Sequence, residues 1–143
     1  MNPLEKPLAS LAFSSNFLFV PGTRPERFSK ALDSGATAVV LDLEDAVPEE
    51  NKEDARNAIR SAWPNFTDDQ KNRLVIRTNS PGSKFYAADL ILAQELNVSC
   101  ILIPKSESMD QINGAALILP NTAIIPMIET ALGLDQLREI ANS

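Results

Sequence analysis

Histidine is absent from the sequence, and cysteine occurs only once, at Cys100. Without histidine, the chain cannot supply a Ser-His-Asp triad, a histidine general base or a Cys/His zinc site. A single cysteine also excludes an internal disulfide framework. Cys100 lies in an apolar run, which predicts a buried strand residue in preference to a reactive thiol.

The sequence also lacks an excess of basic residues, with 13 Lys and Arg against 19 Asp and Glu and a net charge of -6. Duplex nucleic-acid binders need a basic face, so we expect no nucleic-acid partner. No apolar stretch reaches the ~18 residues of a membrane span, so we expect no membrane partner. Residues 1–16 lack the apolar core of a secretion signal. They predict a flexible N-terminal arm, with cytoplasmic residence as the default.

Five short apolar runs, each of the length of a buried strand, recur along the rest of the chain. They cover residues 17–20, 38–43, 74–78, 100–103 and 123–128. Segments of helical character lie between them, over 24–34, 53–63, 86–96 and 109–119, and a fifth begins near Leu132. This alternation predicts an α/β domain over 17–143 with right-handed βαβ units and a parallel sheet.

About five βα units are predicted, and they would form an incomplete barrel if the fold is of the TIM (β/α)8-barrel type, because a whole barrel takes about 250 residues. A doubly wound open sheet is the competing architecture, but no glycine-rich nucleotide-binding motif follows any of the runs. Capping boxes are predicted at Thr23 with Glu26 and at Ser108 with Gln111. Gly35 can end the first helix in a left-handed conformation.

Ionisable residues gather where the predicted strands end. Period-2 alternation puts Asp42 and Glu44 on one face of their strand, and Arg77 takes the matching place on the next. In the fourth strand the same alternation groups Ile101 and Ile103 with Lys105 and Glu107. Unpaired buried charge is costly, and the C-terminal strand ends form the ligand face of parallel α/β folds. The residues predicted to converge there are Asp42, Glu44, Arg77, Lys105, Glu107 and Glu129.

Carboxylates beside a guanidinium have a defined chemistry. Mg²⁺ is held by one or two carboxylates together with water and substrate oxygens. The planar fork of Arg77 fits a carboxylate or a phosphate. For any single residue, a strand-exit charge that reaches solvent is the plain alternative, and for Lys105 it is a salt bridge with a neighbouring carboxylate.

Five motifs occur in order along the chain: FLFVPGTRPER from Phe17, LDLEDAV from Leu41, VIRTN from Val75, IPKSE from Ile103 and PMIET from Pro126. Together they resemble the citrate lyase beta-subunit family, which belongs with the aldolase/citrate lyase enzymes of the phosphoenolpyruvate/pyruvate superfamily. The resemblance implies a TIM barrel and a Mg²⁺-dependent carbon–carbon lyase. Such an enzyme cleaves or forms a bond in citryl-, malyl- or methylmalyl-type thioesters.

The resemblance also assigns roles. Arg77 matches the arginine that binds the substrate carboxylate, and Glu129 the glutamate that ligates Mg²⁺ beside the substrate. Asp42 and Glu44 match acidic residues near the metal, acting through water. The further residues that match the substrate-binding region are Arg24, in the first loop, and Lys105 with Glu107, at the end of the fourth strand.

The implied mechanism is a retro-Claisen cleavage that yields a thioester and an oxo acid. The metal and Arg77 would hold the oxo-acid end, and the base that takes the hydroxyl proton is not identified. The implied partners are an acyl-CoA or acyl-carrier thioester, a small oxo acid and further copies of the chain in a homo-oligomer.

Family members continue for roughly as many residues again, so the resemblance implies a truncated chain that lacks a second metal-binding aspartate and has little or no activity alone. One alternative is a non-catalytic half-barrel kept for association or binding. The other is a pyruvate-type aldolase that acts on hydroxy-oxo acids without a thioester. The PGTRPE and LDLED runs favour the lyase branch.

Overall fold

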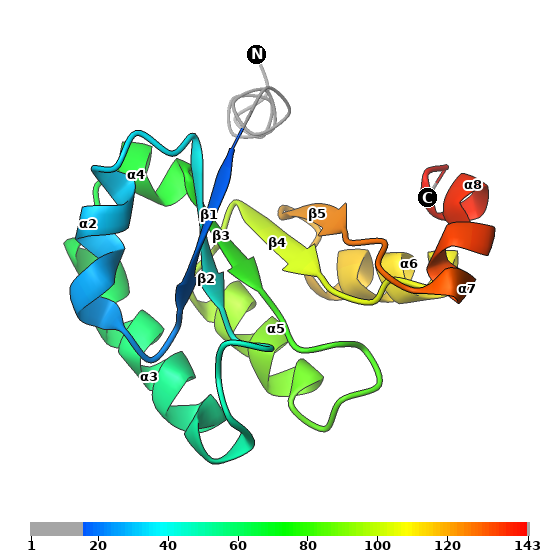
Figure 1. Ribbon diagram of the computed structural model, residues 1–143, viewed down its shortest axis with the longest axis horizontal. Helices are drawn as coiled ribbons and strands as arrows, with labels where there is room; N and C mark the ends of the chain where they lie inside the picture. The colour runs from blue at the N-terminus through cyan, green and yellow to red at the C-terminus, as the bar shows by residue number, and fades with distance from the viewer. Residues whose placement is uncertain (1–15, 143) are drawn as a thin grey trace.

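The computed structural model describes residues 16–142. Five parallel strands form one sheet in the order β1-β2-β3-β4-β5, so each strand pairs with the next along the chain (Figure 1). They are β1 (Phe17–Pro21), β2 (Ala38–Asp42), β3 (Leu74–Arg77), β4 (Cys100–Ile103) and β5 (Ala123–Pro126). All five strands predicted from the apolar runs are present, with ends that differ by no more than two residues.

Helices alternate with the strands. The α-helices are α2 (Phe28–Leu32), α3 (Lys52–Ala62), α4 (Asp68–Asn72), α5 (Tyr86–Glu95), α6 (Met109–Ile118), α7 (Ala131–Asp135) and α8 (Leu137–Ile140). Short 3-10 helices are η1 (Pro25–Arg27), η2 (Glu49–Asn51) and η3 (Trp63–Asn65). Among these described helices, none is long and apolar enough to cross a membrane.

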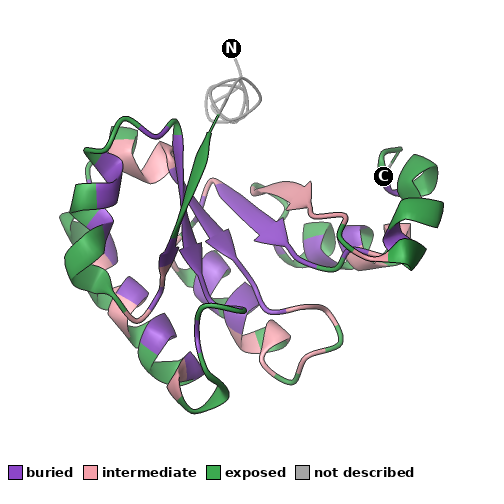
Figure 2. Cartoon of the chain, in the orientation of Figure 1, coloured by how far each residue is buried: buried purple, intermediate pink, exposed green. Residues whose placement is uncertain are grey.

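The two faces of the sheet have different neighbours. Val39, Leu41 and Ile76 pack with the buried residues of α2, α3, α5 and α6 in the larger core. Val40 and Val75 belong to a second cluster on the opposite face, which contains strand residues and the segment just after β5. Figure 2 shows the central strands buried and the outer helix surfaces exposed.

This arrangement distinguishes the two architectures that the sequence left open. A doubly wound sheet reverses its strand order at a switch point and carries helices on both faces. Here the order runs from β1 to β5 without reversal, and the buried helix residues pack on one face. The winding is that of a (β/α)8 barrel, of which the described residues form five βα units.

The predicted face of β4 was wrong. Ile101 and Ile103 pack in the core beneath the helices, and Cys100 and Leu102 lie on the opposite face. Alternation fails to extend from β4 to Lys105 because Lys105 has a φ of 49°, a left-handed conformation that turns the chain. Lys105 therefore leaves the strand in a direction that period-2 counting does not give.

Helix boundaries were predicted with mixed success. The capping box of Ser108 and Gln111 is present before α6, and Gly35 has the expected positive φ of 86°. The box at Thr23 is wrong, because η1 begins at Pro25 and its N-cap is Arg24, with no side-chain capping bond. α4 was not predicted, although its N-cap Thr67 forms a capping box.

The expected N-terminal arm falls on residues 1–15, which lie outside the described residues, and on Asn16. The backbone N–H of Thr37 donates to Asn16 Oδ1 at 2.7 Å, at the start of the β1–β2 pairing.

Candidate functional site

Arg77 and Asp42 form the centre of the site at the C-terminal ends of neighbouring strands. They are partners in the β2–β3 register, which brings their side chains to the same edge of the sheet. Arg77 Nε donates to Asp42 Oδ1 at 2.8 Å, and Nη2 donates to Oδ2 at 2.6 Å. This bidentate pair is buried, and its hydrogen bonds raise the pKa of Arg77.

Asp42 is fixed from a second side by the turn that follows β2. The backbone N–H of Glu44 donates to Oδ1 at 2.8 Å, and that of Ala46 donates to Oδ2 at 3.1 Å. Each carboxylate oxygen thus accepts two hydrogen bonds. Asp42 therefore links the β2 loop to Arg77, and a water-mediated role beside a metal would require one of these bonds to break.

Glu44 lies between two cations. Its Oε1 accepts a hydrogen bond from Lys105 Nζ at 2.6 Å, and its Oε2 lies 3.2 Å from Arg77 Nη1. The Oε2 atom is buried, and no hydrogen bond reaches it from the part of the chain that the structure describes. The bond to Glu44 raises the pKa of Lys105, so this lysine is a cation at neutral pH.

Lys105 connects this cluster to Glu129. Its backbone N–H donates to Glu129 Oε1 at 2.9 Å, and its side chain reaches back to Glu44. The backbone at this residue is left-handed, with a φ of 49°. Strained conformations of this kind in non-glycine residues concentrate at functional sites.

The structure brings four of the six predicted residues, Asp42, Glu44, Arg77 and Lys105, into direct side-chain contact. Glu129 joins them through the Lys105 backbone. Glu107 lies instead at the start of α6, where its backbone N–H donates to Gln111 Oε1 at 2.8 Å. Arg24 is mainly exposed and pairs with Glu26 at 3.8 Å. Within residues 16–142, neither Arg24 nor Glu107 forms a hydrogen bond or an ion pair with the cluster.

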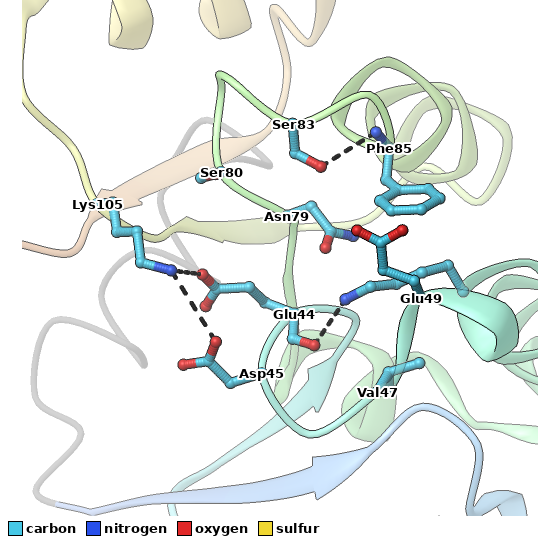
Figure 3. A pocket seen from close by; sticks show the side chains of 10 residues that line it. Glu44, Asp45, Val47, Glu49, Asn79, Ser80, Ser83, Phe85 and Lys105 are labelled. Atoms are coloured by element: carbon cyan, nitrogen blue, oxygen red, sulfur yellow. Dashed lines mark hydrogen bonds and ion pairs between the residues drawn. The ribbon is translucent and has the colours of Figure 1, made fainter.

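A cavity of about 300 Å³ adjoins the cluster (Figure 3). Its walls come from the loops after β2 and β3 and from Lys105. The lining residues are Glu44, Asp45, Val47, Glu49, Lys52, Asn79, Ser80, Ser83, Phe85 and Lys105.

Two buried groups in or near the wall of this cavity were not anticipated from the sequence. Lys52 Nζ donates to the carbonyl oxygens of Leu43 at 2.6 Å and Glu44 at 2.7 Å, and burial lowers its pKa. The sequence feature that could have drawn attention to Lys52 is its place in the first turn of a helix, where the positive end of the helix dipole disfavours a cation.

The second group is Asp89, which is fully buried on α5. It accepts from the backbone N–H and Nδ2 of Asn79, both at 2.7 Å, and from Arg56 Nη1 at 2.9 Å. Burial raises the pKa of Asp89. A carboxylate can only accept, so Asn79 turns Nδ2 toward Asp89 and its carbonyl oxygen away. The network fixes the loop after β3 that lines the cavity.

The carboxylates of the cluster differ in whether they are free to bind Mg²⁺. Asp42 and Glu44 are engaged by cations, whereas the exposed Glu129 accepts its hydrogen bond through Oε1. No group of three or more acidic or cysteine side chains is placed to hold a metal within residues 16–142. Mg²⁺ commonly keeps several waters and takes one or two carboxylates. Among the described carboxylates of this cluster, Glu129 is the one that forms no ion pair, so it would be the residue to hold Mg²⁺.

Comparison with known proteins gives relatives along almost the whole chain. Citrate lyase subunit beta-like protein of Mycobacterium tuberculosis (strain ATCC 25618 / H37Rv) is 38% identical over 130 residues, which are 91% of this chain and 44% of the relative. A (3S)-malyl-CoA thioesterase of Cereibacter sphaeroides (strain ATCC 17025 / ATH 2.4.3) is 32% identical over 125 residues, or 87% and 43% of the two chains. The chain thus spans less than half the length of these curated relatives.

Solved structures agree with the sequence relatives. The citrate lyase beta subunit from M. tuberculosis, complexed with oxaloacetate and magnesium, superposes with a TM-score of 0.75 at 38% identity. The match covers 87% of this chain and 52% of that one. The sequence profile of the HpcH/HpaI aldolase/citrate lyase family matches residues 16–143. A profile that spans this much of the chain, together with the shared fold, shows that the chain belongs to the HpcH/HpaI aldolase/citrate lyase family.

Proposed function

We propose that the chain is part of a Mg²⁺-dependent carbon–carbon lyase. Its substrate would be a 3-hydroxyacyl thioester such as citryl-CoA or malyl-CoA, and its products a thioester and an oxo acid. The observation that carries the proposal is the bidentate placement of Arg77 on Asp42 beside the Lys105–Glu129 connection. The relative from M. tuberculosis whose structure contains oxaloacetate and magnesium supports the substrate class. A second structure of that protein, with magnesium, acetoacetate and coenzyme A, supports the thioester half.

Arg77 would bind the carboxylate of the oxo-acid portion. Asp42 holds its Nε and Nη2 edge, so substrate must be met from the Nη1 side. Glu129 would ligate Mg²⁺. When bound, this ion acts as a Lewis acid that stabilises the negative charge on the oxo-acid oxygen. Lys105, kept protonated by Glu44, would add positive charge to this side of the cavity.

In the retro-Claisen step, a base takes the proton of the substrate hydroxyl and a carbonyl forms. The electron pair of the broken carbon–carbon bond moves to the thioester α-carbon as an enolate, which is then protonated. Lys105 is unsuited to be the base because its pKa is raised and it remains a cation. Arg24, exposed in the first loop, stays a candidate contact for the substrate.

A metal-binding assay and an activity assay together test the proposal. Mn²⁺ titrated into the chain should bind about tenfold more weakly to Glu129→Gln than to wild type. Glu139→Gln, which removes an exposed carboxylate on α8, is the matched control and should bind like wild type. Equal Mn²⁺ binding by all three proteins would remove Glu129 from the metal site.

Activity is measured as oxo acid released from citryl-CoA and malyl-CoA. Release that needs Mg²⁺ and falls at least a hundredfold in Arg77→Lys supports the lyase. Cleavage of hydroxy-oxo acids with no requirement for CoA would favour the pyruvate-type aldolase.

The partial length of the chain makes turnover by it alone the weaker test. A folded chain that binds neither Mn²⁺ nor oxaloacetate would favour a non-catalytic, associating half-barrel.

The proposal includes cytoplasmic residence and a homo-oligomer. Size-exclusion chromatography with light scattering tests the homo-oligomer. A monomeric mass would contradict it.

A further inference from the structure

Arg77 is enclosed on three sides. Asp42 holds the Nε and Nη2 edge, the Phe19 ring centroid lies 5.0 Å from Cζ, and Glu44 Oε2 lies 3.2 Å from Nη1. Its side chain is only 9% exposed. A substrate carboxylate therefore cannot reach the guanidinium unless one of these groups gives way. Any role of these groups in substrate binding rests on the proposed function of Arg77 in binding an oxo acid.

The contacts show which group can yield. Asp42 has all its acceptor positions in use, two of them by backbone N–H groups of the β2 loop, so moving it would disrupt that loop. Phe19 belongs to β1, and its ring makes a cation–π contact with Arg77 that uses none of the guanidinium N–H donors.

Glu44 differs from both. Its Oε2 contacts Nη1 without a hydrogen bond, and its Oε1 has a separate short bond to Lys105 Nζ. The Lys105 side chain is 47% exposed and can move with its partner. Glu44 can thus leave Arg77 without becoming an unpaired buried charge, which is the penalty that would otherwise prevent the movement.

We propose that Glu44 is a specificity-determining residue that occupies the Nη1 face of Arg77 and is displaced toward Lys105 by the substrate carboxylate. The displacement exchanges one carboxylate for another, so the net charge around Arg77 is unchanged. A ligand must bring enough additional binding to overcome this internal competitor. The site therefore discriminates against small carboxylates that have no further contacts.

The Glu44→Gln variant tests the competition. Glutamine keeps the shape and an acceptor for Lys105 but removes the negative charge that opposes the incoming carboxylate. Oxaloacetate, titrated in the presence of EDTA and followed by NMR, should bind about tenfold more tightly to Glu44→Gln than to wild type. Glu50→Gln removes the same charge from an exposed site in η2 and should bind like wild type. Equal or weaker binding by Glu44→Gln would overturn the proposal.

A measurement on wild type keeps the test independent of how the variant folds. Saturating oxaloacetate should shift the Glu44 carboxylate carbon resonance and leave the Arg77 Nε–H resonance in place, because the Asp42 bond persists. A shift of Nε–H with an unchanged Glu44 signal would mean that Asp42 yields, and would refute the idea.

Arg77→Lys separates this inference from the proposed function. If Arg77→Lys weakens oxaloacetate binding but Glu44→Gln does not tighten it, Arg77 keeps its role and Glu44 is not a competitor. If Arg77→Lys binds oxaloacetate as wild type does, the substrate-binding role of Arg77 itself fails.

Discussion

Replacing Asp42 by asparagine measures how much the centre of the site depends on one carboxylate. Four donors converge on its two oxygens: Arg77 Nε and Nη2, and the backbone N–H groups of Glu44 and Ala46. An asparagine side chain offers one acceptor oxygen, and its NH₂ group would face donors at the other position. The variant also leaves the buried Arg77 without its bidentate partner.

The expected loss follows from these contacts. Removing one partner of a buried ion pair costs about 3–5 kcal/mol, and hydrogen bonds to charged groups are worth about 1.5–3 kcal/mol each without being additive. Because Glu44 still faces Arg77, we expect Asp42→Asn to lower the free energy of unfolding by about 3–4 kcal/mol. Typical domains have about 5–15 kcal/mol in total, so the variant should lose a large part of its stability and still fold well enough for unfolding to be measured.

Urea unfolding followed by circular dichroism provides the measurement. Asp45→Asn is the control, because Asp45 is the exposed acidic residue next to Glu44 and its replacement should change stability by no more than about 0.5 kcal/mol. A loss below about 1 kcal/mol for Asp42→Asn would show that the four converging bonds do not hold the site together.

Three further predictions concern Lys105, two glycines and the single cysteine. Because the folded-state pKa of Lys105 is raised, its contribution to stability is present below the ordinary lysine pKa of 10.5 and is lost as the pH rises through the higher folded value. The Lys105→Met variant should lack this loss when urea unfolding is measured between pH 9 and about pH 12. Identical pH profiles for wild type and variant would contradict the prediction. Gly133→Ala should lower the free energy of unfolding by about 1–3 kcal/mol, because a Cβ there would collide with the carbonyl oxygen of Ser106. Gly114→Ala, in open space within α6, should raise it by up to about 1 kcal/mol. Changes of the same sign in the two variants would contradict this prediction. Burial raises the pKa of Cys100 to about 12, so a thiol reagent at pH 8 should label it only after unfolding, and rapid labelling of the folded chain would refute its burial.

The sequence was most informative where burial follows a simple period. Short Val- and Ile-rich runs predicted the five strands, because strands covered on both faces are almost continuously apolar. Arg77 and Asp42 were correctly placed on the same edge because parallel strands end together. The order of the strands, and hence the barrel-type winding, required the structure or the family resemblance.

Local exceptions to periodicity explain the errors. The face of β4 was misassigned because counting by two assumes an extended backbone, and Lys105 is left-handed. Thr23 was predicted as the N-cap, whereas Arg24 is the N-cap in the structure. The spacing of Thr23 and Glu26 alone does not show at which residue the helical turn begins.

Long-range partners explain what was missed. Asp89 lies 33 residues from Arg56 and 10 from Asn79 in sequence, so no local pattern marks it as the centre of a buried network. The motif around Glu44 also did not predict its contact with Arg77. A metal and an arginine can each be bound by a carboxylate at a strand end, so the sequence did not distinguish the two partners.

Arg77 and Glu129 are proposed to form one substrate site, with Arg77 held by Asp42 and opened by the movement of Glu44. A crystal structure of the chain grown with oxaloacetate and Mg²⁺ would show whether they do. We expect an oxaloacetate carboxylate on Arg77 Nη1, an Mg²⁺ ion on Glu129, an intact Arg77–Asp42 pair and Glu44 bonded only to Lys105. Oxaloacetate bound elsewhere, with Glu44 still against Arg77, would contradict the account.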